Sequence, residues 1–344
     1  MRWLCRNHSF TESEIVLFGL SVCRYGTRTG AGGNEKYISL FPQQIIARPF
    51  LDSVLKTAGE GYDYYFLVRT AGIGEAYLLN FMYKRLQEKL GFKNACIVTH
   101  RRAYQDMYRQ FLPQVPCYVT EGGIRPYNDY LNARFLQYKH KVFQVIHCTL
   151  PESDRLFKNY VKGYDVPYPE VIKKWAGVDR FIENRPQFSA EDKAVVEKVA
   201  GLNLDKFILL IPEANNVKPR SNKFWPSLAA KLKEKGYDIY VNTKDGICSY
   251  GMSADIPISQ VAYLASLAKG IVSIRAGLLE YVSTFDNPKH VIYGEHVWHP
   301  LKAGELMKTS SLCYYPMVDK KLVFEYNPDE MSEEKIIEQI AERF

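Results

Sequence analysis

The fold is decided by the stretch Tyr64-Tyr65-Phe66-Leu67-Val68, which leads through Arg69-Thr70 into Ala71-Gly72-Ile73-Gly74-Glu75. Five consecutive apolar residues are typical of a strand buried in a parallel sheet. The two glycines predict a turn. From Glu75 to Lys89 apolar residues recur at helical spacing, which predicts an amphipathic helix. A strand, a glycine turn and a helix form the first part of a βαβ unit.

The same alternation continues along the chain. In the first half we expect strands at 95–98, 115–119 and 142–146 and a helix at 103–111. In the second half we expect strands at 207–211, 237–241, 271–274 and 291–293, with helices at 224–235, 258–268 and 278–284. Strands that alternate with helices predict an α/β protein with parallel sheets.

Two alternating sets predict two domains, as does the length of 344 residues. We expect the boundaries to give a first domain at 63–180 and a second at 190–330, with the connection in the irregular segment 151–191. Residues 1–62 precede these domains, and the sequence assigns them no function. They predict a helix that begins near Thr11, a glycine-rich loop at 26–33 and a further helix at 43–57. Residues 331–344 predict a terminal amphipathic helix.

Composition limits the class of function. Lys and Arg exceed Asp and Glu by 45 − 38 = 7, which suits an anionic partner such as a nucleotide or a membrane surface. No long run of basic residues occurs, so we expect no nucleic-acid partner. The seven cysteines are scattered without CxxC spacing, which argues against a zinc site or a disulfide framework and fits the cytoplasm.

The first motif with possible chemistry is Arg69 to Glu75. Glycines allow a ligand to approach the backbone, and the start of a helix offers free N–H groups. Glu75 could act there as a general base. The alternative is that Glu75 only complements the helix dipole. The third glycine of a dinucleotide fingerprint is absent, because Tyr77 occupies its place.

The second motif follows the strand at 207–211. Pro212 and Glu213 begin a polar loop that holds Lys218, Arg220 and Lys223 ahead of a helix. Cations between a strand and a helix suit a diphosphate. The alternative is a solvated polar loop with Trp225 in the core.

The third motif is Arg275-Ala276-Gly277-Leu278-Leu279-Glu280, again between a strand and a helix. An Arg at the end of a buried strand requires an anionic partner, which could be the protein or a ligand. The sequence contains no Asp-x-Asp pair, so we expect no metal-bound diphosphate and no metal site.

Together the three motifs resemble the heptosyltransferase-like glycosyltransferases, family 9 of the GT-B class. That family has a Gly-Asp at the first helix start, where this chain has Gly74-Glu75. Its Pro, polar loop and Lys-x-Trp-Pro match Pro212 and Lys223-Phe224-Trp225-Pro226. Its Asp-Thr/Ser-Gly-x-x-His corresponds to the stretch from Arg275 to Glu280, with the Asp replaced by Arg and the His by Glu.

The resemblance implies a GT-B fold, with two Rossmann-like domains that face each other across a cleft. It implies an inverting, metal-independent transfer from a nucleotide-diphosphate sugar, without a cofactor. The acceptor would be a glycan or a lipid-linked molecule in bacterial surface polysaccharide synthesis, such as lipopolysaccharide or capsule. Glu75 would be the catalytic base. Arg69, Gly72 and Gly74 would bind the acceptor. The donor would contact Pro212, Glu213, Lys218, Arg220, Lys223, Thr243, Arg275, Gly277, Leu278 and Glu280.

Two alternatives remain open at this point. One is a nucleotide- or NAD-dependent Rossmann enzyme of another reaction type, and the other is a non-catalytic protein that binds a nucleotide or a sugar. We expect the protein to be cytoplasmic, with possible peripheral contact to the inner face of the membrane.

Overall fold

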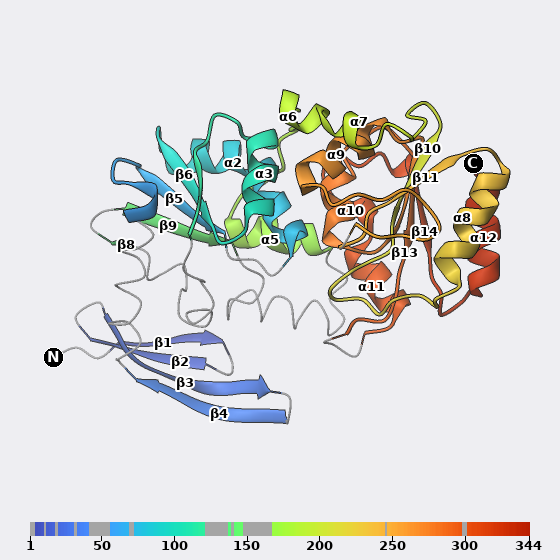
Figure 1. The fold of residues 1–344 in the computed structure, drawn as a ribbon. Coiled ribbons are helices and arrows are strands. Elements are labelled where there is room, and N and C mark those ends of the chain that lie inside the picture. The colour runs from blue at the N-terminus through green and yellow to red at the C-terminus, as the bar shows by residue number, and fades with distance from the viewer. Residues whose placement is uncertain are drawn as a thin grey trace.

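The computed structural model describes residues 4–9, 12–17, 20–30, 33–40, 56–68, 72–120, 137–138, 141–146, 167–244, 246–297 and 301–344. Two sheets of mainly parallel strands dominate the fold and lie side by side, with helices α2, α3, α9 and α10 between them (Figure 1). The predicted α/β architecture with two Rossmann-like halves is therefore confirmed.

The first half contains a five-stranded sheet in the order β7-β6-β5-β9-β8. Its strands are β5 (Tyr64–Val68), β6 (Ala95–Thr99), β7 (Cys117–Val119), β8 (Gln137–Tyr138) and β9 (Lys141–Ile146). All neighbours pair in parallel except β8, which pairs antiparallel with β9. The helices of this half are α2 (Ile73–Leu90), α3 (Arg102–Phe111) and α5 (Tyr168–Ala176).

The second half contains a five-stranded, fully parallel sheet in the order β11-β10-β12-β13-β14. Its strands are β10 (Phe207–Ile211), β11 (Asp238–Val241), β12 (Gly270–Ile274), β13 (Lys289–Ile292) and β14 (Val323–Tyr326). Its helices are α6 (Ala190–Lys193), α7 (Val195–Lys198), α8 (Phe224–Glu234), α9 (Ile258–Leu267), α10 (Gly277–Val282), α11 (Ala303–Ser310) and α12 (Glu333–Glu342), with 3-10 turns η3 (Leu312–Tyr314) and η4 (Lys320–Leu322).

Alternation along β10 explains how the second sheet is covered on both faces. Ile208 and Leu210 point to one face, where they pack in a cluster with α8 and α12. Phe207, Leu209 and Ile211 point to the other face, where α9 and α10 lie. Successive strand residues face opposite sides of a sheet, so a strand with apolar residues at every position requires helices on both faces.

The hydrophobic core is continuous between the two halves. One buried cluster includes Phe66 of β5 and Tyr77 of α2 from the first half together with Leu209 of β10 and Tyr281 of α10 from the second. Interfaces of this apolar kind resemble the interior of a domain more than a transient contact between domains. The two halves therefore pack against each other through their helices.

The segment before residue 56 was predicted incorrectly where the structure describes it. In place of a helix near Thr11 and a loop at 26–33, strands β1 (Leu4–Ser9), β2 (Glu12–Leu17), β3 (Leu20–Gly30) and β4 (Gly33–Leu40) form an antiparallel sheet. A four-residue capping pattern is a weak signal, and β-branched residues such as Ile15 and Val16 favour strands. Residues 43–55 of the other predicted helix lie outside the described residues.

Candidate functional site

The predicted donor residues converge on one edge of the second sheet. In a parallel sheet all strands end at the same edge, which is where doubly wound folds bind ligands. Pro212 to Lys223 follow β10, Thr243 follows β11, and Arg275 to Glu280 follow β12. The ten residues that the sequence assigned to the donor therefore follow three adjacent strands, seven of them in the loops and three, Gly277, Leu278 and Glu280, in helix α10.

The loop after β10 is fastened to the loop after β13. The Lys218 Nζ and the Glu295 Oε2 form an ion pair at 2.7 Å, and the Lys218 backbone N donates to the Glu295 carbonyl. Both side chains are about half exposed. Glu213, near the start of the loop after β10, accepts a hydrogen bond of 3.2 Å from the backbone N of Lys244 in the loop after β11. Lys223 is exposed and directly precedes α8. The loop therefore presents cations at the sheet edge.

Two buried polar atoms at this edge have no hydrogen-bond partner within the part of the chain that the structure describes. They are the Arg220 Nε and the Thr243 Oγ1, on the loops after the neighbouring strands β10 and β11. An unsatisfied buried donor or acceptor costs about 1–3 kcal/mol. A polar ligand or water at this edge would remove that cost.

Arg275 finds its anionic partner within the protein. Its Nη2 donates to the Glu280 Oε1 at 2.5 Å, its Nε to the Ser310 carbonyl at 2.8 Å and its Nη1 to the Ala276 carbonyl at 3.3 Å. The side chains of Arg275 and Glu280 are 7% and 8% exposed. Burial alone would lower the pKa of Arg275, but the Glu280 carboxylate raises it well above its usual range. The guanidinium therefore stays charged and paired.

The first motif meets the third at the junction of the two halves. A Cβ at Gly277 would lie 2.9 Å from the Gly74 backbone N and 3.0 Å from the Ile73 Cγ2, and a Cβ at Gly74 would overlap the Glu280 carboxylate. We expected Gly74 to let a ligand approach the backbone. In the structure Gly74 and Gly277 permit the starts of α2 and α10 to touch.

The structure does not describe the side chains of two of the predicted site residues. Glu75 lies within α2, but its side chain is outside the part of the chain that the structure describes, and so is Arg69. Leu278 is half-buried against the shared core. Trp225, in the first turn of α8, is buried in the core, as the alternative interpretation of the second motif expected for that side chain. The roles of Glu75 and Arg69 stay predictions.

Sequence reasoning missed a set of polar side chains beneath this edge. The Tyr293 hydroxyl donates to the Glu325 Oε1 at 2.6 Å, and the other carboxylate oxygen accepts from the Ser311 hydroxyl at 2.7 Å. Tyr293 is fully buried, and burial raises its pKa well above the usual range. No local motif links these residues, because they come from β14 and the segments beside it.

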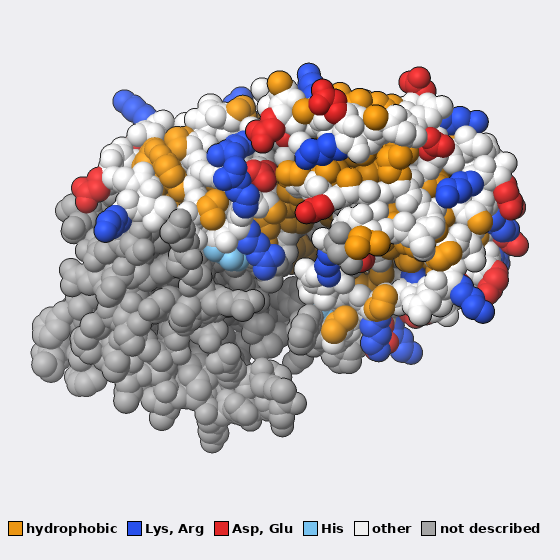
Figure 2. All heavy atoms as spheres, in the orientation of Figure 1, with side chains coloured by type: hydrophobic (Ala, Val, Ile, Leu, Met, Phe, Trp, Pro, Cys, Tyr) orange, Lys and Arg blue, Asp and Glu red, His pale blue; other side chains and the backbone are white. Residues whose placement is uncertain are grey.

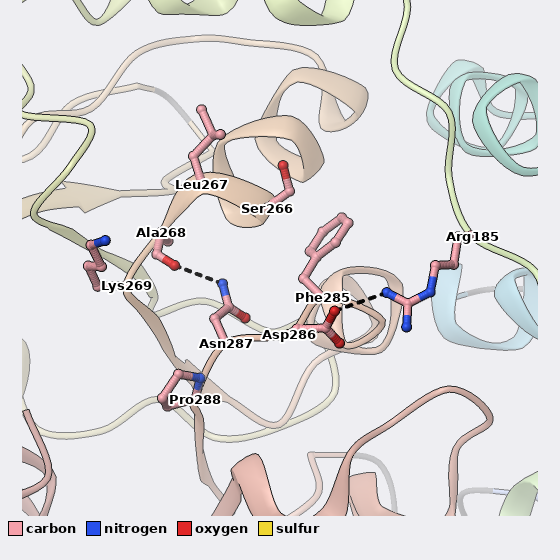
Figure 3. A pocket seen from close by; sticks show the side chains of 9 residues that line it. All are labelled: Arg185, Ser266, Leu267, Ala268, Lys269, Phe285, Asp286, Asn287 and Pro288. Atoms are coloured by element: carbon pink, nitrogen blue, oxygen red, sulfur yellow. Dashed lines mark hydrogen bonds and ion pairs between the residues drawn. The ribbon is translucent and has the colours of Figure 1, made fainter.

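One surface cavity in the described part of the chain lies at the opposite edge of the second sheet. It has a volume of about 390 Å³ and is lined by Arg185, the end of α9 and the segment from Phe285 to Pro288 (Figure 3). This segment precedes β13, so the cavity opens at the amino ends of the strands. Asp286 pairs there with Arg185 at 3.3 Å. The cavity is therefore separate from the donor loops.

The surface has an apolar hollow at the junction of the two halves (Figure 2). On the face shown in Figure 2 the molecule is hollowed where the two halves meet, with hydrophobic side chains in the hollow and charged ones at its rim.

Among the described residues no group of three or more His, Cys, Asp or Glu side chains is placed to hold a metal ion. Within the same residues, no helix has the length and apolar character needed to cross a membrane.

No protein-family model matches this sequence, and no curated protein matches it. Comparison with solved structures is informative. A glycosyl transferase family 9 protein from Veillonella parvula superposes over 83% of this chain and 99% of its own, with a TM-score of 0.53 and 12% identity. The chain has the GT-B fold.

Two further GT-B structures are similar to a lower degree. The E. coli heptosyltransferase WaaC with ADP is 15% identical over 81% of this chain and 99% of its own, with a TM-score of 0.49. The dodecameric, iron-containing heptosyltransferase TibC of enterotoxigenic E. coli, in complex with ADP-D-beta-D-heptose, is 13% identical with a TM-score of 0.49. That match covers 75% of this chain and spans 63% of the TibC chain. The likeness to the Veillonella parvula protein, at 12% identity, shows the fold alone.

Proposed function

We propose that this protein is a glycosyltransferase that takes a sugar from a nucleotide-diphosphate donor. The observation that carries the proposal is the edge of the second sheet, where Lys218 and Lys223 are exposed and two buried polar atoms, the Arg220 Nε and the Thr243 Oγ1, lack partners. A nucleoside diphosphate supplies negative charge, which the lysines attract, and polar atoms that can form hydrogen bonds with the two unpaired groups. The GT-B fold supports this location.

The proposed reaction is an inverting displacement without a metal or a cofactor. Glu75 takes the proton from an acceptor hydroxyl, whose oxygen forms a bond to the anomeric carbon of the donor. The bond between that carbon and the diphosphate oxygen breaks, and the nucleoside diphosphate leaves with the electron pair. Cations at the sheet edge stabilise the charge that develops on the leaving group. Gly72, Gly74 and Arg69 would lie on the acceptor side.

The acceptor would be a glycan or a lipid-linked glycan in bacterial surface polysaccharide synthesis, and the protein would act in the cytoplasm, with peripheral contact to the membrane. A net charge of +7 supports attraction to an anionic donor and to anionic lipid alike.

A nucleotide panel in thermal unfolding tests the proposal. We expect one nucleoside diphosphate among UDP, GDP and ADP to raise the unfolding midpoint, whereas CMP and NAD leave it unchanged. Binding that stabilises only the folded state raises the free energy of unfolding by about 2.7 kcal/mol at 100 times Kd. A response to NAD alone would favour the dinucleotide alternative and contradict the proposal.

A further inference from the structure

The buried ion pair of Arg275 and Glu280 belongs to the second half and lies where this half meets the first. Three nitrogen atoms of the Arg275 side chain already donate to protein acceptors, and its guanidinium lies over the Tyr315 ring at 5.2 Å. A diphosphate could bind this group only by displacing those acceptors. The arrangement therefore fixes Arg275 and leaves it poorly placed to bind the donor.

Glu280 in turn contacts the other half. While one carboxylate oxygen accepts from Arg275, the other packs against the Cα of Gly74 in the first turn of α2, so closely that no side chain could be accommodated at position 74. The start of a helix carries a partial positive charge, which stabilises a nearby carboxylate. The Glu280 carboxylate of the second half thus contacts the N-terminal turn of α2 in the first half.

A neighbouring set of buried hydrogen bonds joins the same elements. Gln110 of α3, in the first half, accepts from the Tyr281 hydroxyl of α10 and donates through its Nε2 to the Ser259 carbonyl of α9 at 3.1 Å. Phe111 also contacts the Tyr281 ring. Polar and apolar contacts therefore fasten α10 to α2 and α3 on both sides of Glu280.

We propose that Arg275 and Glu280 are positioning residues that join the two halves and do not bind the donor. Arg275 holds the Glu280 carboxylate in place, and Glu280 fixes the first turn of α2, the helix that carries Glu75. The contact between the halves stands by itself, whereas the statement about the donor and the base rests on the proposed function.

Substitution of Gly74 by Ala tests the contact, because the change in the unfolding midpoint should have opposite signs with and without the Glu280 side chain. In the otherwise unchanged protein the added methyl group overlaps Glu280, so Gly74→Ala should lower the unfolding midpoint by about 2–10 °C. In the Arg275→Met, Glu280→Ala background the obstacle and the unpaired charge are both absent. There the same substitution should raise the midpoint by about 1–4 °C, because Ala forms helices better than Gly.

Gly304→Ala in α11 is the matched control, because the nearest atoms to a Cβ there all belong to the Asn327 side chain, away from the junction. Its effect should be the same in both backgrounds. If Gly74→Ala alone fails to fold, recovery of folding in the Arg275→Met, Glu280→Ala background supports the contact. A Gly74→Ala effect that is equal in both backgrounds, or stabilising in both, overturns it.

Two further readouts separate a contact between halves from a role inside the second half. In the Arg275→Met, Glu280→Ala protein, amide hydrogen exchange at residues 73–78 of α2 should be about tenfold faster, with β6 unchanged. The Kd for the nucleoside diphosphate should stay within about threefold. Unchanged exchange in α2, or a loss of affinity beyond about tenfold, contradicts the inference. If no nucleotide binds the unaltered protein, the proposed function fails while the Gly74 result still decides the contact.

Discussion

His290 should make the stability of this protein depend on pH in a defined window. The side chain is completely buried in β13, stacked with Phe324 and Tyr326, and its Nδ1 lies 2.8 Å from the Tyr326 hydroxyl. Burial, with a smaller effect from Arg343, lowers its pKa from 6.5 to about 3. The folded protein therefore holds His290 neutral at pH values where the unfolded chain protonates it.

The sign and the size follow from that difference. Between pH 6.5 and about 3 the unfolded chain binds one proton more than the folded protein at this residue, so the free energy of unfolding falls as the pH falls. The contribution is full above pH 6.5 and decreases by about 1.4 kcal/mol for each unit below it. From well above pH 6.5 down to pH 4.5, His290 should thus account for a loss of about 2.7 kcal/mol.

Urea unfolding of the unaltered protein and of His290→Phe, each at several pH values from about 7 down to about 4.5, measures this contribution. Other groups titrate in both proteins, so the difference between the two slopes isolates His290. Tyr326→Phe is the control, because it removes the hydroxyl partner and keeps the buried imidazole, and it should retain the slope. Equal slopes for the unaltered protein and His290→Phe would refute the reasoning.

The remaining predictions concern the proposed reaction. Glu75→Gln should reduce the rate of sugar transfer by a factor of about 10²–10⁴ with nucleotide affinity unchanged, because the amide cannot take a proton. Glu75→Asp should keep partial activity. A near-normal rate in Glu75→Gln would show that Glu75 is not the base. Transfer should proceed fully in EDTA, and a strict need for added Mg²⁺ or Mn²⁺ would count against a diphosphate held by cations. Thr243→Val should raise the midpoint of the free protein, since it removes an unpaired buried hydroxyl, yet weaken binding of the nucleoside diphosphate about fivefold or more; tighter or equal binding would place that hydroxyl outside the site.

The apolar strands could be predicted from the sequence almost residue by residue. The run at 207–211 was predicted as a strand, and β10 has those bounds. Helices α8 and α9 begin at the predicted residues. Buried parallel strands give continuous apolar runs and their helices give a clear period, so pattern and structure agree. The antiparallel strands β1–β4 carry a weaker pattern of mixed polar residues, and a local capping motif obscured it.

The candidate site was predictable only where its residues depend on local sequence. Loops that follow parallel strands must gather at one edge, so the grouping of Lys218, Thr243 and Arg275 followed from their positions directly after predicted parallel strands. The sequence showed that Arg275 needs an anion and could not name Glu280 as its source, because a ligand satisfies the same need. The reason for Gly74 lies in the other half of the molecule, which no local pattern reveals.

The most direct test of the central claim is the affinity of a nucleoside diphosphate for the edge of the second sheet. Isothermal titration calorimetry would compare the unaltered protein with Lys223→Ala and with Lys233→Ala, which removes an exposed lysine at the far end of the same helix. If Lys223 makes a charged hydrogen bond to the diphosphate, worth about 1.5–3 kcal/mol, its loss should weaken binding by about 10- to 100-fold, while Lys233→Ala binds normally. Equal affinity in all three proteins would contradict the proposed donor site.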